Sequence, residues 1–391
     1  MNRALVLVPS VAFLLLAARP ASACGGFACD SNLVEPPVQD AERIVFAVTD
    51  GPEPRTTATV QISYQGRAES FAWIVPLTAI PEQIEVADAA LFDELELATA
   101  PTFVQQLPSA GGSYGGGGGS SFGCGCSDEP TAARAMAGAA GSEDETAQEV
   151  TVYSRAQVGP FDTVVVAADD ATVLGAWLQT NGFDLPVGAD ALLASYVDER
   201  STFLAVKLVP GADTKAIQPL RFSYAGLPCL PLRLTAISTA DVLPVQLFVA
   251  ANRRAIPDDW PAADPDYDGK LIVTGASTNY REVIDSLTEE FGGHAWITEY
   301  AGPPPALAPG GAARIALGSM PFLTRLYARV PRAALDRDPH FTFDDASAEV
   351  SNVHFLSPPQ APAQGSVLVA PGAWFLAGLF SWLLYGRPRR R

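Results

Sequence analysis

Alternating apolar and polar side chains mark the first ordered part of the chain. Residues 58–64 alternate without interruption, and the glycine-containing residues that follow break the pattern as a hairpin turn would. The runs at 42–47 and 70–77 are rich in Val, Ile and aromatic residues, which favour strands. At 88–98, leucine and phenylalanine recur at helical spacing between acidic residues. We therefore expect an antiparallel sheet followed by a short amphipathic helix.

The second half of the chain mixes the two periods. Strand-like runs lie at 150–158, 161–168, 202–209, 220–224, 232–237, 245–250, 271–274 and 295–300. Helix-like runs lie at 170–180, 189–197, 278–291 and 321–329, and residues 340–343 read as extended. The pattern predicts an α+β fold with β-rich antiparallel sheets and a few packed helices, plus one C-terminal transmembrane helix.

The first apolar segment reads as an export signal. Arg3 precedes an apolar run at 4–18, and Ala21-Ser22-Ala23 has the small-residue cleavage pattern, so residues 1–23 are expected to be removed. Cleavage leaves Cys24 as the first residue. An alternative is lipidation of Cys24, although Ala21 stands where such processing usually has leucine.

The last apolar segment predicts a membrane anchor. Residues 366–385 carry no charge, and as a helix twenty residues span about 30 Å, the thickness of the hydrocarbon layer. The segment is followed by a basic stop in residues 386–391, made of Arg387, Arg389, Arg390 and Arg391. We expect a single-pass membrane protein whose basic tail is cytoplasmic. An alternative is a sorting tail that is clipped off after export.

Composition divides the chain between the export signal and the predicted membrane anchor into four regions. Residues 24–107 form the N-terminal β-rich part and 150–356 the α+β remainder of an ectodomain. Between them, residues 108–149 are rich in Gly, Ala and Ser, which predicts a mobile insertion. The proline-rich residues 357–365 are expected to be a stalk.

The exported part is strongly acidic. Without Arg3, Arg19 and the four C-terminal arginines, 19 basic residues face 43 acidic ones, a net charge of about −24. Such a surface repels phosphate backbones, so we expect no nucleic-acid partner. The expected partners are a membrane, through the C-terminal helix, and an unknown protein or ligand. The charge suits cations or basic ligands, and solubility alone also accounts for it.

The cysteines are disulfide candidates, because an oxidising compartment favours pairing. They are Cys24, Cys29, Cys124, Cys126 and Cys229. The pair Cys24–Cys29 is preferred, since two glycines in the intervening loop allow a short ring to close. A disulfide between Cys124 and Cys126 would close a strained ring, so Cys229 or a metal ion is an alternative partner for each of these two cysteines.

One acidic turn has the spacing of a calcium loop. Asp264, Asp266 and Asp268 precede a glycine in the D-x-D-x-D-G order that surrounds a hard cation. The glutamate that closes such loops is replaced by Gly275, and Asp258 or Asp259 is an alternative closing ligand. The other interpretation is an acidic, solvated turn. No further cofactor is expected.

Histidines and tryptophans offer weaker signals. His294, His340 and His354 lack the spacing of a zinc site, and the chain has no G-x-S-x-G elbow, so packing or surface roles are expected. The tryptophans of structured segments are Trp73, Trp177, Trp260 and Trp296. Trp73 and Trp177 are expected in the core, whereas Trp260, among prolines and acids, is the expected exposed platform.

Several short motifs together resemble the bacterial DUF2330 family, a group of exported proteins of unknown function. They are Cys-Gly-Gly-Phe-Ala-Cys from Cys24, residues 39–46, Phe-Ala-Trp-Ile-Val-Pro at 71–76, residues 91–95 and 98–101, the Cys-Gly-Cys insertion, and residues 322–329 with Asp338-Pro339. The resemblance implies an envelope protein and supplies no catalytic residues.

Two functions follow as hypotheses. The first is a membrane-anchored extracytoplasmic protein of the bacterial cell envelope, with a binding or structural ectodomain and no enzymatic activity. The alternative is an exported hydrolase, for which a metal ion is an option. The sequence contains no catalytic signature that decides between them.

Overall fold

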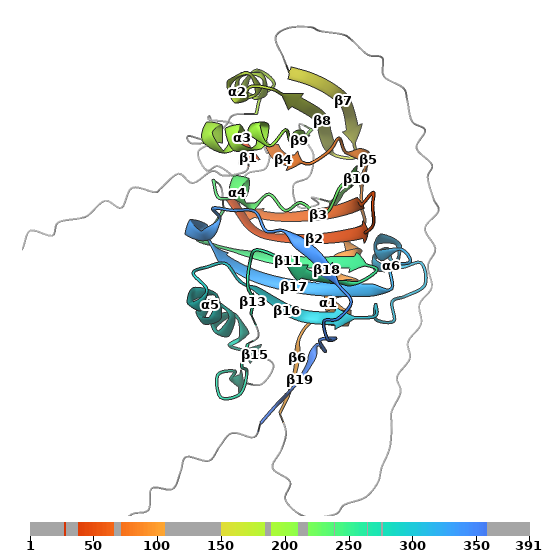
Figure 1. The fold of residues 1–391 in the computed structure, drawn as a ribbon, viewed down its shortest axis with the longest axis vertical. Helices are drawn as coiled ribbons and strands as arrows, with labels where there is room; N and C mark the ends of the chain where they lie inside the picture. Colours follow the sequence, from red (N-terminus) through yellow and green to blue (C-terminus); the bar gives the residue numbers. More distant parts are fainter. Residues whose placement is uncertain are drawn as a thin grey trace, which may run out of the picture.

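Two stacked β-sheets form the body of the protein. The computed structural model describes residues 27–28, 38–65, 72–105, 150–183, 189–209, 218–237, 239–263, 265–274 and 277–357. Figure 1 shows a five-stranded sheet with α2 and α3 at the top of the view and an eight-stranded sheet below it. The described residues also form three two-stranded units.

The eight-stranded sheet has the order β13-β16-β17-β11-β2-β3-β10-β5. Its centre is β2 (Val38–Thr49), which pairs antiparallel with β3 (Arg55–Gln65) and parallel with β11 (Val242–Ala251). The outer strands are β5 (Glu82–Val86), β10 (Leu220–Ala225), β13 (Ala262–Ala263), β16 (Trp296–Gly302) and β17 (Phe322–Pro331). The sheet is therefore mixed, and not purely antiparallel as expected.

The five-stranded sheet is antiparallel throughout. Its order is β1 (Phe27–Ala28), β4 (Ala72–Leu77), β9 (Thr202–Leu208), β8 (Phe161–Ala168) and β7 (Val150–Val158). Along β9, Phe203 and Ala205 face α2 (Ala171–Thr180) and α3 (Ala189–Asp198), which cover the outer face. Leu204 and Val206 face the other sheet. This alternation buries both faces.

The main hydrophobic core fills the space between the two sheets. β2 contributes Ile44 and Phe46 to it, and β11 contributes Leu247, each no more than 1% exposed. Burial of one such side chain stabilises the fold by about 1.5–3 kcal/mol. Because the same core includes Leu204 and Val206 of the upper sheet, the two sheets depend on each other for their burial.

Helices cover the opposite face of the large sheet. Leu91, Phe92 and Leu95 of α1 (Ala90–Thr99) pack with Val45 and with α6 (Ala312–Leu317), while α5 (Tyr280–Glu290) covers another part. The remaining helical elements are α4 (Leu232–Thr235) and a 3₁₀ turn at Arg332–Ala334. Three further strand pairs complete the described part: β6 (Thr102–Gln105) with β19 (Val353–Leu356), β12 (Arg254–Pro257) with β18 (Phe341–Asp344), and β14 (Val273–Thr274) with β15 (Ser277–Thr278).

Two predicted elements are of the wrong type. The segment at 321–329, expected as a helix, is β17, which lies between β11 and β16. A strand that is buried on both faces carries apolar residues at consecutive positions, so the period of two is lost. The segment at 232–237, expected as a strand, contains the short helix α4.

The predicted fold class is also wrong in its transmembrane helix. Within the described ranges, no helix is long and apolar enough to cross a bilayer. The longest of them, α5, has 11 residues, whereas a span needs about 20. The segment at 366–385, with Arg387, Arg389, Arg390 and Arg391, lies outside the described residues, as do residues 1–23, 108–149 and 358–365. What the structure describes is a β-rich α+β fold with mixed sheets.

Candidate functional site

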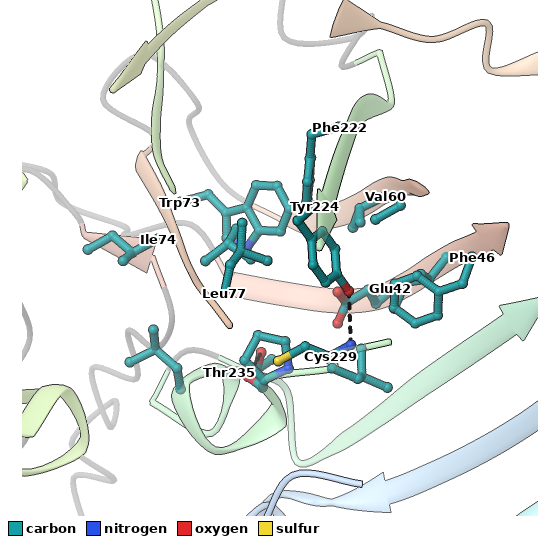
Figure 2. A pocket seen from close by; sticks show the side chains of 16 residues that line it. Glu42, Phe46, Val60, Trp73, Ile74, Leu77, Phe222, Tyr224, Cys229 and Thr235 are labelled. Atoms are coloured by element: carbon teal, nitrogen blue, oxygen red, sulfur yellow. Dashed lines mark hydrogen bonds between the residues drawn. The ribbon is translucent and has the colours of Figure 1, made fainter. Parts of the chain in front are cut away.

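A small cavity between the two sheets is the candidate site. Its walls come from β2, β3, β4, β10 and the segment leading into α4, and its lining includes Glu42, Trp73, Tyr224 and Cys229 (Figure 2). The cavity has a volume of about 20 Å³. This is room for a single water molecule, and far below the several hundred Å³ typical of ligand pockets, about 300–1,000 Å³.

Glu42 is the buried acid of this cavity. The alternation of β2 places it on the same face as Ile44 and Phe46, and it is 6% exposed. Gln39 donates from Nε2 to Oε2 of Glu42 at 3.2 Å. Burial raises the pKa of Glu42 from 4.5 to about 7, an increase that the bond from Gln39 reduces. Near neutral pH the carboxyl is therefore poised between its two protonation states.

Two other polar side chains of the cavity, those of Tyr224 and Cys229, contact backbone atoms. The Tyr224 hydroxyl accepts a hydrogen bond from the Cys229 amide at 3.0 Å, the dashed line in Figure 2. The Cys229 thiol lies 4.0 Å from the carbonyl oxygen of Pro76. Burial, together with the negative charges of Asp338 and Glu199, raises the pKa of Cys229 to about 12. Because the thiolate is the reactive form, Cys229 is not poised as a nucleophile.

The cavity can take up a proton or a water molecule. A carboxyl with a shifted pKa in a cleft is a frequent mark of acid–base catalysis. Catalysis also needs space for a substrate next to the carboxyl, and the walls here are mostly apolar side chains of the core. The cavity beside the Glu42 carboxyl, about 20 Å³ in volume, holds no more than a water molecule.

Substituting Glu42 by glutamine is expected to remove a pH-dependent loss of stability. The pKa is raised in the folded state, so the favourable contribution is complete below about pH 4.5 and is lost as the pH rises through about 7. A shift of this size corresponds to about 3 kcal/mol. In urea unfolding between about pH 5 and 8, the advantage of Glu42→Gln over wild type should grow to that value. A pH-independent difference would show that Glu42 titrates normally.

A second buried polar cluster lies on the opposite face of the large sheet. Arg325 of β17 is 2% exposed and donates from Nε to Glu299 at 2.5 Å. Its other guanidinium nitrogens donate hydrogen bonds to Thr99 Oγ1 and Gln246 Oε1, both at 3.1 Å, and form an ion pair with Glu96 at 2.9 Å. The guanidinium thereby joins the end of α1 to three neighbouring strands.

A third cluster joins the two layers. Asp338 accepts hydrogen bonds from the amide and Nε of Arg233, at 2.8 and 2.9 Å, and from the Tyr196 hydroxyl at 2.7 Å. Arg233 lies 4.3 Å above the Tyr196 ring and also pairs with Glu199 at 2.9 Å. Since Tyr196 belongs to α3 and Asp338 follows β17, this cluster connects the cover of the upper sheet to the lower sheet.

The predicted calcium ligands are only partly in view. Asp264 lies outside the described residues. Asp266 accepts a hydrogen bond from the Asp268 amide at 3.1 Å, and the Asp268 carboxylate accepts two from Ser357, at 2.9 and 2.8 Å. In the described part of the chain, no three His, Cys, Asp or Glu side chains gather as metal ligands would. The calcium site stays a prediction.

The disulfide candidates are also only partly described. Cys229 lies beside the cavity, whereas Cys24, Cys29, Cys124 and Cys126 fall outside the described residues. The predicted pair Cys24–Cys29 is therefore untested.

The histidines occupy separate places. His294 pairs with Asp336 at 2.7 Å, His340 with Asp259 at 3.1 Å, and His354 stacks on Phe103 with ring centroids 5.4 Å apart. They do not converge on one cleft.

The tryptophans include one wrong prediction. Trp260, expected as an exposed platform, is 1% exposed, and its ring centroid lies 6.0 Å from that of Trp296. It therefore belongs to the core. Trp73 lines the cavity, and Trp177 is half-buried beneath Arg155.

Sequence reasoning did not single out Glu42, Arg325 or Asp338 as site residues. Glu42 begins a strand-like run, but the apolar residues of that run are consecutive, so the sequence does not show to which face the carboxyl points. The other two had no signal at short range, since their partners lie up to 226 and 142 residues away along the chain.

Comparison with known proteins gives one family match. The model of a family described as an uncharacterized protein conserved in bacteria, DUF2330, matches residues 18–342. No curated protein matches the chain. A solved structure of a mutated baculovirus P35 after caspase cleavage is similar with a TM-score of 0.27 and 11% identity, over 62% of this chain and 73% of that one. A TM-score this low does not indicate a shared fold.

Proposed function

Because the chain belongs to DUF2330, a family of uncharacterized proteins conserved in bacteria, we propose that it is an exported bacterial envelope protein with a binding or structural role. Export is supported by the signal-like residues 1–23, and the acidic composition suits an extracytoplasmic surface. The proposal concerns the folded body of the protein and assigns it no catalytic step.

The observation that carries the proposal is how the buried charged groups are used. Arg325 and Asp338 lie within the short motifs that resemble the family, and the hydrogen-bonding groups of both side chains are paired with other groups of the protein where elements meet. Glu42, in a third motif, lines a cavity of only about 20 Å³. Buried charged groups that are hydrogen-bonded where elements meet hold those elements in place, which supports a structural role for these residues.

A fractionation experiment tests export. The full chain, produced in a bacterium, should be recovered outside the cytoplasm with a mature N-terminus at Cys24, as judged by intact mass. An added lipid mass on Cys24 would keep export and change the processing route. Recovery of the uncleaved chain from the cytosol would overturn this part of the proposal.

A turnover screen tests the role. The purified protein is expected to leave ester, peptide, phosphate and glycoside substrates unchanged, with Glu42→Gln as the matched variant. Hydrolysis that is present in wild type and lost in a folded Glu42→Gln protein would replace the proposal by the hydrolase alternative, because a general acid or base would then reside in the cavity.

A further inference from the structure

A groove on the surface of the protein runs beside α5. Its volume is about 390 Å³, which lies within the range of about 300–1,000 Å³ that is typical of ligand sites. One wall is α5 together with Asn279 before it, and Pro265, Asp266 and Lys270 line the other. Figure 1 shows α5 on the outside of the large sheet, directly after β15. More than half of the lining residues are exposed, so the groove can be reached from solution.

Hydrogen bonds fix the second wall against α5. The Asn279 side chain accepts a hydrogen bond from the amide of Ile272 at 2.6 Å and donates one to the carbonyl oxygen of Lys270 at 3.0 Å. Tyr267, in the same segment of chain, is 9% exposed, and its ring centroid lies 4.9 Å from that of Phe103. The groove is therefore formed before a ligand binds, which limits the ordering that binding requires.

Helical spacing divides the α5 wall into an apolar floor and a polar rim. Val283 and Leu287 both line the groove and are four residues apart, so they lie on one line of the helix. Glu282, Ser286 and Glu290 follow the adjacent line at the same spacing. Val283 is 8% exposed, whereas both glutamates are exposed. Eight helical residues separate the two glutamates by about 12 Å along the helix axis.

The groove carries negative charge that the protein does not neutralise. Asp266, Glu282 and Glu290 are accompanied by one basic residue, Lys270. In the part of the chain that the structure describes, none of these four side chains takes part in an ion pair. The net charge of the whole chain, −18, adds to the negative potential. A cationic ligand is favoured, whereas phosphate backbones and anionic lipid surfaces are repelled.

We propose that the groove binds an extended segment of a partner protein that has two basic residues four positions apart and an apolar residue midway between them. In an extended strand, residues i, i+2 and i+4 point to the same side, and four residues span about 13 Å. The basic side chains then meet Glu282 and Glu290, while the apolar one contacts Val283 and Leu287. The inference rests on the proposed binding role and gives the partner its chemistry.

Other occupants match the groove less well. A polyamine that reaches both glutamates also carries a charged nitrogen between its ends, and this nitrogen would lie against Val283 and Leu287, where it loses water without gaining a counter-ion. A single ammonium group reaches one glutamate only. A second copy of this chain is repelled by its own negative charge. A segment of a different, basic protein matches both the charge and the apolar floor.

Binding of a synthetic peptide to the purified full chain tests the proposal. The probe is a fluorescently labelled Lys-Thr-Leu-Thr-Lys peptide, followed by anisotropy at physiological ionic strength, and saturable binding is expected. The double substitution Glu282→Gln and Glu290→Gln should weaken binding about tenfold, because two exposed ion pairs are lost. The matched control is Glu289→Gln, an exposed glutamate of α5 that does not line the groove, and it should leave binding unchanged.

Variants of the peptide test the spacing and the floor. Moving the second lysine by one position turns it to the other side of the strand, and replacing leucine by serine removes the contact with the floor. Each change should weaken binding several-fold. Absence of saturable binding, an equal loss in the Glu289→Gln protein, or competition by spermidine that is as strong as that of the unlabelled peptide would overturn the proposal.

The peptide test and the export test fail independently. The purified chain needs no export for the titration, so a chain that is found in the cytosol but binds the peptide would contradict export alone. A chain that is exported but does not bind the peptide would contradict the groove proposal and leave the envelope location in place.

Discussion

Replacing Arg325 by methionine is expected to lower the free energy of unfolding by about 3–5 kcal/mol, because removal of one partner leaves a buried charge uncompensated. Glu299, the carboxylate left behind, is 2% exposed and would keep only the hydrogen bond from the Tyr280 hydroxyl, at 2.5 Å. Thr99 and Gln246 would lose a donor at the same time. Urea unfolding at neutral pH measures the loss.

Arg329, on the same strand β17 as Arg325, provides the control for this substitution. Arg329 pairs with Asp285 at 2.5 Å, but the Asp285 side chain is 39% exposed. Arg329→Met is therefore expected to cost about 1 kcal/mol or less. Equal losses in the two variants would show that the Arg325 cluster contributes no more than a surface pair.

Substituting Asp338 by alanine is expected to cost about 3 kcal/mol, since buried donors that lose a charged acceptor are expensive to leave unpaired. The change removes both bonds to Arg233 and the bond to the Tyr196 hydroxyl. Arg233 would retain its ion pair with Glu199 at 2.9 Å and its hydrogen bond to the Ser195 hydroxyl at 3.3 Å. Urea unfolding gives the size of the effect, and faster amide exchange in α3 would show that the layers have loosened.

A nearby aspartate provides the comparison. Asp336 pairs with His294 at 2.7 Å and its side chain is 66% exposed, so Asp336→Ala should cost less than about 1 kcal/mol. If Asp338→Ala were as mild, or if amide exchange in α3 were unchanged, Asp338 would not connect the layers.

Sequence patterns predicted those elements whose two faces differ. β3 (Arg55–Gln65) was predicted because one of its faces meets the core between the sheets and the other is more polar, which preserves a period of two. α2 was predicted as well, and its cap is Asp170, which accepts hydrogen bonds from the amides of Thr172 and Val173. β17 was missed because helices and a sheet bury it from both sides.

The candidate site could be predicted only where it depends on residues that are close together in the sequence. The strand that carries Glu42 is readable from the sequence, but the face to which Glu42 points is not, and the cavity also needs Tyr224 and Cys229, about 180 residues away. Likewise, nothing near Asp338 indicates Arg233 or Tyr196, because their meeting results from how the two sheets stack. Local pattern cannot encode such contacts between distant segments.

The place of β2 in the middle of the large sheet has a consequence for biogenesis. Its two neighbours are β3, which follows at once, and β11, whose residues 245–250 align with residues 42–47. In a polypeptide that emerges N-terminus first, the β3 edge of the β2–β3 hairpin stays unpaired until β10 has appeared, and the β2 edge until β11 has appeared, nearly two hundred residues later. Nascent chains of this protein should depend on holding chaperones during that interval.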